Sequence, residues 1–252
     1  MNKDLTISVV GAGTAGCFTV LYLSENLPDV KIKWVVESLT NNIGVGEATV
    51  PTVQEFLTDL GYNIQYIIKN CAGTMKLGVK FVNFSDKTFW HPFGNTRDEQ
   101  EELLYISRKN KIPDNIFEYS DIATHFDVSI LIKDIYANIS KRKNVDIVKS
   151  SSDCDINIMC TGFDTDNKFI RADKILNNQA IIYRCPSPDS SDNIPYTTCT
   201  GRDHGWSWKI PLGSAITYGY VNDGHPDAYN EFTDCLRREG VDIDHIKPRI
   251  LN

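Results

Sequence analysis

The chain has 252 residues, of which 41% are hydrophobic and 23% are charged. These fractions are typical of a globular protein and exclude a disordered or fibrous one. The formal net charge of −7 argues against a broad phosphate-binding surface, so we expect no nucleic-acid partner. At ~150 residues per domain the length allows one or two domains, and we expect a single domain over residues 1–252.

The seven cysteines and the first residues of the chain indicate in which cellular compartment we expect the protein. An odd number of cysteines without C-x-x-C spacing is typical of reduced thiols and not of disulfides or a zinc site. The first residues do not resemble a signal peptide, and no apolar stretch of about 18 residues occurs. We therefore expect a cytoplasmic protein without a membrane segment, and the histidine spacing predicts no metal site.

The first forty residues predict a β-α-β unit, residues 1–40. A β-branched run over residues 5–10 predicts a strand buried on both faces. It is followed by the glycine turn of residues 11–16, then by a helix that starts near Cys17 and ends before Pro28. Residues 31–36 predict a second strand, and Glu37 comes directly after it.

This order of elements predicts dinucleotide binding. Gly11 allows the tight turn, Gly13 lets the backbone approach a pyrophosphate, and Gly16 lets the helix pack closely on the strand. The start of the helix attracts phosphate, and Glu37 lies where an acid can accept hydrogen bonds from a ribose. An ordinary glycine-rich turn is the alternative, and the pattern does not distinguish NAD from FAD.

Two further segments follow the β-α-β unit. The loop of residues 43–52 precedes a predicted helix, Val53 to Gly61, which Thr49 or Thr52 could cap and near whose start Pro51 lies. The loop could fold over a cofactor, or it could be an ordinary connection. Residues 74–81 alternate between apolar and polar side chains, which predicts a strand with Lys76 on its polar face. By periodicity alone, Lys76 is a surface lysine.

The second half predicts a buried strand that begins at Asp155 and ends near Gly162. Strand ends of this kind face the cofactor in doubly wound folds, although a plain core strand is equally consistent. Trp206 and Trp208 lie two residues apart, so they share one face of a strand and could serve as a core anchor.

Several motifs together resemble the flavin-dependent tryptophan halogenases. The resemblance rests on the glycine turn, on Glu37-Ser38, on the run from Gly44 to Pro51, on residues 74–83, on His125-Phe126-Asp127 and on G-W-S-W-K-I-P at 205–211. The last motif is the most specific because two tryptophans and a proline keep a fixed register. It lies in the expected halogenase-motif segment, residues 196–222.

The resemblance implies an α/β chain with a Rossmann-like FAD-binding fold and a mixed sheet, a compact version of the flavin monooxygenase and halogenase architecture. It implies reduced FAD from a separate flavin reductase, O2, a halide and an aromatic substrate such as tryptophan. Lys76 would present the electrophilic halogen, by hydrogen bonding or as a haloamine. The implied cofactor contacts are Gly11, Gly13, Thr14, Ala15, Gly16, Glu37, Ser38, Glu47, Ala48 and Gly162. Trp206, Trp208, Ile210 and Pro211 would lie near the flavin.

The chain departs from the family in length. Family members carry a later segment with a glutamate, a halide-binding backbone and substrate-binding helices, and this sequence has no match to it. A homo-oligomer or a completing chain would then supply those groups. The alternatives are an inactive or incomplete FAD-binding remnant of a halogenase and an NAD-dependent oxidoreductase.

Overall fold

A computed structural model describes residues 5–38, 48–94, 121–150, 154–162, 175–187 and 194–251. The chain divides into two compact units, which we describe separately. Unit 1 comprises residues 1–44 and 128–171, and unit 2 comprises residues 45–127 and 172–252. The single domain over residues 1–252 stays a prediction.

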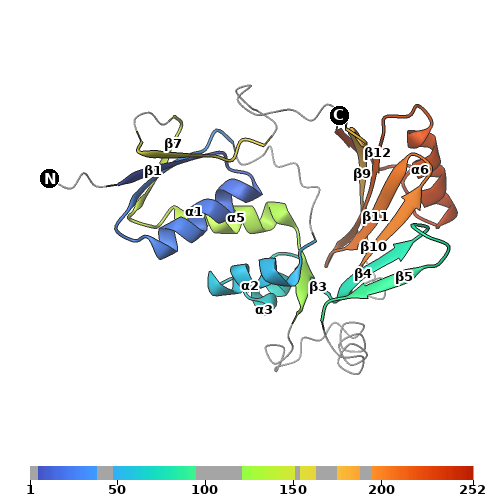
Figure 1. Cartoon of the computed structure of the whole chain (residues 1–252), viewed down its shortest axis with the longest axis horizontal. Coiled ribbons are helices and arrows are strands. Elements are labelled where there is room, and N and C mark those ends of the chain that lie inside the picture. The colour runs from blue at the N-terminus through green and yellow to red at the C-terminus, as the bar shows by residue number, and fades with distance from the viewer. Residues whose placement is uncertain are drawn as a thin grey trace. The chain divides into compact units, whose positions relative to one another are not determined.

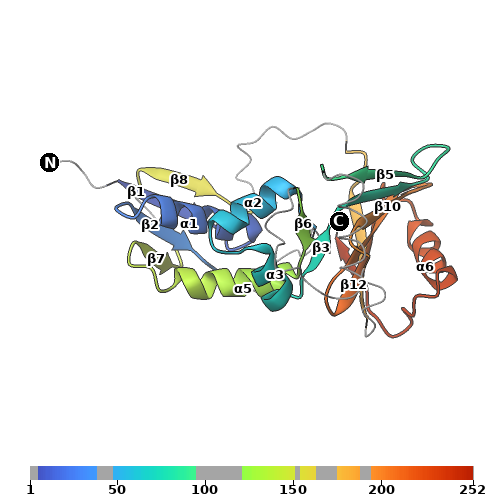
Figure 2. The same ribbon diagram turned by 90° about the horizontal axis from the view of Figure 1, so that it is seen from below.

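Unit 1 is built on a parallel sheet with the strand order β7-β2-β1-β8. Its strands are β1 (Thr6–Val10), β2 (Lys31–Val35), β7 (Val145–Val148) and β8 (Ile156–Met159). Helices α1 (Thr14–Asn26) and α5 (Val128–Ile139) lie side by side on one face of this sheet (Figures 1 and 2). The expected strand, glycine turn, helix and second strand are all present, because β-branched runs alternate with an apolar helical segment.

Strand β8 differs from its prediction. The run after Asp155 was expected to be buried, but Ile156 and Met159 are 45% and 50% exposed. In the described sheet, β8 pairs only with β1 and forms an edge. A strand at an edge has a neighbouring strand on one side only and is therefore less covered. Apolar composition alone does not show that a strand lies at an edge.

Unit 2 contains a mixed sheet of seven strands with the order β13-β9-β12-β11-β10-β4-β5. The strands are β4 (Gly78–Val82), β5 (Phe89–Pro92), β9 (Gln179–Pro186), β10 (Thr197–Arg202), β11 (Gly205–Pro211), β12 (Ala215–Asn222) and β13 (Arg249–Leu251). Only the β10–β4 pair is parallel, and the other pairs are antiparallel.

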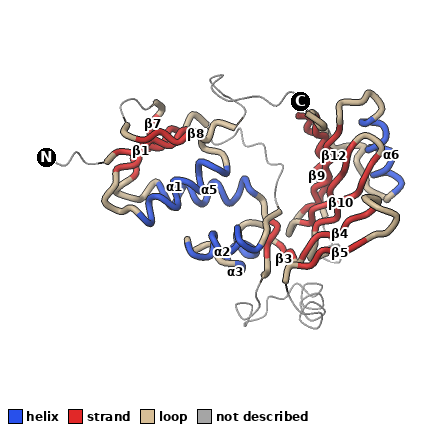
Figure 3. Tube along the Cα trace, in the orientation of Figure 1, coloured by secondary structure: helices blue, strands red, loops and turns tan. Residues whose placement is uncertain are grey.

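A second, two-stranded sheet pairs β3 (Thr74–Lys76) with β6 (Ala123–His125). Helices α2 (Pro51–Asp59) and α3 (Ile64–Asn70) lie next to it (Figure 3). The predicted single strand over residues 74–81 is divided at Leu77, so β3 and β4 belong to different sheets. In the described part of the chain, no helix is long and apolar enough to cross a membrane.

The start of α2 corrects a second expectation. Val50 is the N-cap and no side chain caps the helix, although Pro51 occupies its first turn as expected. The Thr49 hydroxyl instead donates to the carbonyl of Thr124 at 2.7 Å. A threonine near a helix start can bond to any backbone group within reach, and here a neighbouring strand provides one.

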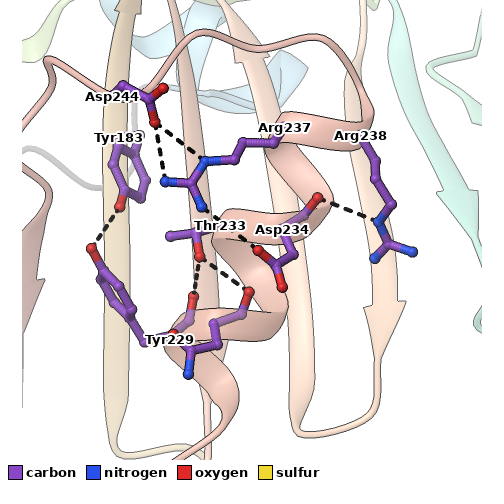
Figure 4. A network of polar contacts seen from close by, with 8 residues as sticks. Tyr183, Tyr229, Thr233, Asp234, Arg237, Arg238 and Asp244 are labelled. Carbon is purple, nitrogen blue, oxygen red and sulfur yellow. Dashed lines mark hydrogen bonds and ion pairs between the residues drawn. The ribbon is translucent and has the colours of Figure 1, made fainter.

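Helix α6 (Ala228–Arg238) packs its apolar side on the large sheet, where Phe232 and Leu236 meet Tyr183 and Tyr220. A polar network fastens the same helix (Figure 4). The Tyr183 hydroxyl donates to the Tyr229 hydroxyl at 3.1 Å, and Arg237 donates to Asp244 through two nitrogens. Apolar burial and the Tyr183–Tyr229 bond hold α6 on β9 and β12, and the Arg237–Asp244 bonds tie the helix to the segment that follows it.

Gly219 gives the first test of this packing. It pairs with Trp208 across β11 and β12, and a Cβ at position 219 would collide with the Trp208 ring. We expect Gly219→Ala to lower the free energy of unfolding by about 1–3 kcal/mol, because the indole has to move. Urea denaturation measures this loss. In a Trp208→Leu background the same change should cost less, and an equal cost would contradict the explanation.

Candidate functional site

The glycine turn of unit 1 has a steric reason for its glycines. Gly11 has φ +114°, which favours glycine, and a Cβ there would collide with the carbonyl oxygen of Cys160. A Cβ at Gly16 would collide with the carbonyl oxygen of Gly11. The two glycines therefore let β1, the start of α1 and the end of β8 come together.

The turn leads into the open start of α1. Gly13 is the N-cap, no side chain caps the helix, and its first turn, which includes Thr14 and Ala15, holds no acidic residue. An uncapped helix start of this kind is suited to an anion. The predicted contacts Glu37 and Ser38 follow β2, and Gly162 follows β8 with φ +70°. Since the strands are parallel, these residues lie along the same edge of the sheet as the turn.

Lys76 lies at the end of β3 in unit 2, and it is only 5% exposed. Its Nζ donates to the carbonyl oxygen of Thr49 at 2.7 Å and lies 5.1 Å from the centre of the Phe93 ring. Burial lowers the pKa of this ammonium from 10.5 to about 8, while the Cys199 thiol acts in the opposite direction. The surface position expected from periodicity is therefore wrong, because neighbouring elements cover the strand.

The acceptor of Lys76 is itself held by buried hydrogen bonds. The Thr49 amide donates to the Thr124 carbonyl at 3.0 Å, and the Thr124 amide donates to the Thr49 hydroxyl at 2.9 Å. The Thr124 hydroxyl donates to Oε1 of Gln54 at 2.6 Å, and Nε2 of Gln54 donates to the Tyr62 carbonyl at 3.2 Å. These bonds occupy the other groups of Thr49 and leave its carbonyl directed at Lys76.

A fully buried histidine lies on the strand next to Lys76. His125 pairs with Thr74 across β6 and β3, and its Nδ1 is 2.9 Å from the Thr74 hydroxyl. Its Nε2 is 3.0 Å from the Thr197 hydroxyl on β10. Burial, and then the positive charge of Lys76, lower the pKa of His125 well below its ordinary value. The imidazole is therefore neutral.

The motif over residues 205–211 forms β11. The Trp206 and Trp208 rings have centres 5.8 Å apart, and Ala48 packs against the cluster that contains Trp208 and Ile210. The Thr74 hydroxyl donates to the Pro211 carbonyl at 2.8 Å. The end of the motif thus meets the strand that carries Lys76. The indole Nε1 of Trp208 is buried and has no hydrogen-bond partner among the described residues.

The predicted site residues fall into two groups. The turn residues 11–16, Glu37, Ser38 and Gly162 lie in unit 1, whereas Ala48, Lys76 and the motif residues Trp206, Trp208, Ile210 and Pro211 lie in unit 2. Glu47 lies outside the described residues. Sequence reasoning missed Thr49 and Phe93 as contacts of Lys76, and no spacing pattern could have found them. Over the described ranges, no cluster of histidine, cysteine and acidic side chains could hold a metal ion.

The chain is similar to several known proteins. A family model described as tryptophan halogenase matches residues 6–126 and 151–227. The tryptophan 6-halogenase ThaL of Streptomyces albogriseolus is 24% identical over 99% of this chain and 62% of its own length. The tryptophan 7-halogenase KtzQ of Kutzneria sp. (strain 744) is 26% identical over 94% of this chain and 59% of its own. The chain thus spans less than two thirds of these relatives.

Solved structures show the same fold. The tryptophan 6-halogenase SttH of Streptomyces toxytricini superposes with a TM-score of 0.81 at 22% identity, over 98% of this chain and 62% of that chain. BrvH, a flavin-dependent halogenase from Brevundimonas sp. BAL3, gives a TM-score of 0.75 at 20% identity, over 99% and 62% of the two chains. The expected Rossmann-like α/β fold is confirmed by these structures. Because the family model covers most of the chain, the chain belongs to the tryptophan halogenase family.

Proposed function

We propose that this chain halogenates an electron-rich aromatic ring, such as that of tryptophan or another indole, with Lys76 presenting the electrophilic halogen. The observation that carries the proposal is the buried ammonium of Lys76, which touches an aromatic ring and a backbone carbonyl. A charged lysine is rarely buried unless its charge is paired, and ionisable groups with perturbed pKa values gather at functional sites. Relatives of the chain carry the names of tryptophan halogenases.

FAD is the proposed cofactor, and the residues of unit 1 fit it. The uncapped start of α1 and the glycines at 11, 13 and 16 would accept its pyrophosphate, and Glu37 would accept hydrogen bonds from its ribose. Solved structures of the same fold are described as flavin-dependent halogenases. When bound in its reduced form, FAD would supply hypohalous acid from O2 and halide.

Lys76 is suited to hold and polarise hypohalous acid. An ammonium has three N–H donors, and among the described residues only the Thr49 carbonyl accepts one of them. A second donor would bind the oxygen of hypohalous acid, so that this oxygen leaves as water while the ring carbon takes the halogen and gives up its proton. The buried position limits access of water, which would otherwise compete for the electrophile.

Several partners belong to this proposal. They are a small aromatic substrate, a halide and a flavin reductase, together with a homo-oligomer or a completing chain. The neutral histidine His125 and the Thr49 carbonyl would act within unit 2 as supports of Lys76 and not as reacting groups.

The first test replaces Lys76. With reduced FAD, O2, bromide and indole, we expect Lys76→Ala to lower the rate of bromoindole formation by ~100-fold or more, because the donor to the leaving oxygen is lost. Mass spectrometry of the product measures the rate. Lys80→Ala is the matched control, since Lys80 lies on the neighbouring strand β4 and is not fully buried. Equal rates in both variants would remove Lys76 from the reaction, and no product from wild type would favour a flavin-binding remnant.

The second test is a pH profile. Because burial lowers the pKa of Lys76 to about 8, the ammonium loses its proton as the pH rises through that value. If the ammonium is the active form, bromination should fall from about pH 7 to about pH 9. In Lys76→Arg, whose guanidinium stays charged, any residual activity should lack this fall. A rise with pH in the wild type would instead indicate the neutral amine and a haloamine.

The third test concerns the cofactor. We expect Glu37→Gln to weaken FAD binding by about 10-fold, because a charged acceptor is lost from the ribose site. Fluorescence titration of FAD gives the dissociation constant. Glu55→Gln is the control, because Glu55 is an exposed residue of α2 in unit 2. Stronger binding of NADH than of FAD would favour a nicotinamide-dependent oxidoreductase.

A further inference from the structure

The hydrogen bonds around His125 determine which of its nitrogens carries the proton. The Thr74 hydroxyl has one hydrogen, and it donates this hydrogen to the Pro211 carbonyl at 2.8 Å. Toward His125, the same hydroxyl can therefore only accept, so Nδ1 carries the proton at this 2.9 Å contact. In a neutral imidazole Nε2 is then an acceptor, and the Thr197 hydroxyl donates to it.

This arrangement links the small sheet to the large one. Thr74 belongs to β3 and His125 to β6, whereas Thr197 belongs to β10 and Pro211 to β11. The chain of bonds from Thr197 through His125 and Thr74 to Pro211 therefore holds β3 against two strands of the seven-stranded sheet. Every bond in it is buried, which makes its loss costly.

Lys76 lies on the same face of β3 as Thr74, two residues further along. Its partner in register on β6 is Ala123, which has a small side chain. Ala48 and Thr49 pair with His125 and Thr124 of β6, and Nζ of Lys76 reaches the Thr49 carbonyl. The position of the amine thus depends on where β3 lies relative to β6.

We propose that His125 is a positioning residue for Lys76. The neutral imidazole donates from Nδ1 to Thr74 and so keeps the lysine amine on the Thr49 carbonyl and away from water. A protonated His125 could not serve here, because it would place a second positive charge beside Lys76. The positive charge of Lys76 acts on His125, and the Cys199 thiol of β10 acts on Lys76. Asp127, on the same segment as His125, is bound by Arg184.

The tautomer is tested directly by 15N NMR of the full chain. We expect His125 to keep its proton on Nδ1 and to stay neutral through the range around pH 6.5 in which an ordinary histidine titrates. A proton on Nε2, or a titration at the ordinary histidine value of about 6.5, would overturn the inference.

The positioning role is tested by variants that keep only one of the two hydrogen bonds made by the imidazole nitrogens. The amide nitrogen of Asn can replace Nδ1, the amide oxygen of Gln can replace Nε2, and Phe replaces neither. With 13C-labelled lysine, assigned by comparison with Lys76→Arg, the titration midpoint of Lys76 should rise by about one unit in His125→Phe and His125→Gln, as water reaches the amine. It should stay near the wild-type value in His125→Asn. His245→Asn is the control for the substitution itself.

The outcomes separate this inference from the function on which it rests. A Lys76 midpoint that is the same in all folded variants overturns the positioning role, whatever the bromination assay shows. A wild type that forms no bromoindole, with the midpoints shifted as expected, refutes the proposed halogenation and leaves the positioning role standing. If His125→Phe does not fold, the contrast between His125→Asn and His125→Gln still decides. In an active enzyme, bromoindole turnover should fall at least ~10-fold in His125→Gln, with partial recovery in His125→Asn.

Discussion

A positive charge buried at Lys76 is the constraint around which unit 2 is built. An ammonium removed from water loses several kcal/mol of hydration unless it finds acceptors or an aromatic face. Here the Thr49 carbonyl and the Phe93 ring provide them, and Thr124 and Gln54 hold Thr49 in turn. The same burial lowers the pKa of Lys76 to about 8, so the charge can be lost near neutral pH. The stability of this region and the protonation of Lys76 thus depend on the same contacts.

Unit 1 depends on close backbone approach instead of buried charge. At Gly11 and Gly16 any Cβ would strike a carbonyl oxygen, so the turn closes only with glycine. Closing it brings the uncapped start of α1 to the edge where the parallel strands end. The chemistry proposed for the protein divides in the same way, with cofactor binding assigned to unit 1 and halogen transfer to unit 2.

The local hydrophobic pattern predicts secondary structure well and the burial of individual side chains poorly. The elements β1, α1 and β2 lie where their apolar spacing predicts them, because that spacing reflects which face each element buries. Burial was misjudged at Lys76 and at β8. Sequence pattern assigns a lysine in an alternating run to solvent and an apolar run to the core. The actual exposure of Lys76 and of β8 depends on which elements lie beside them. The cap expected from Thr49 is absent for the same reason, since the Thr49 hydroxyl oxygen accepts from the Thr124 amide of a neighbouring strand and Val50 is the N-cap.

The sequence by itself determined the β-α-β unit, the glycine turn and the motifs by which the family is recognised, because these depend on residues close together in the chain. Only the tertiary structure decided that Lys76 is buried, that Thr49 is its acceptor and that His125 is neutral with its proton on Nδ1. Those properties arise from contacts between segments 27 to 137 residues apart. No local spacing specifies such contacts, since they form only when β3, β6, β10 and β11 pack together.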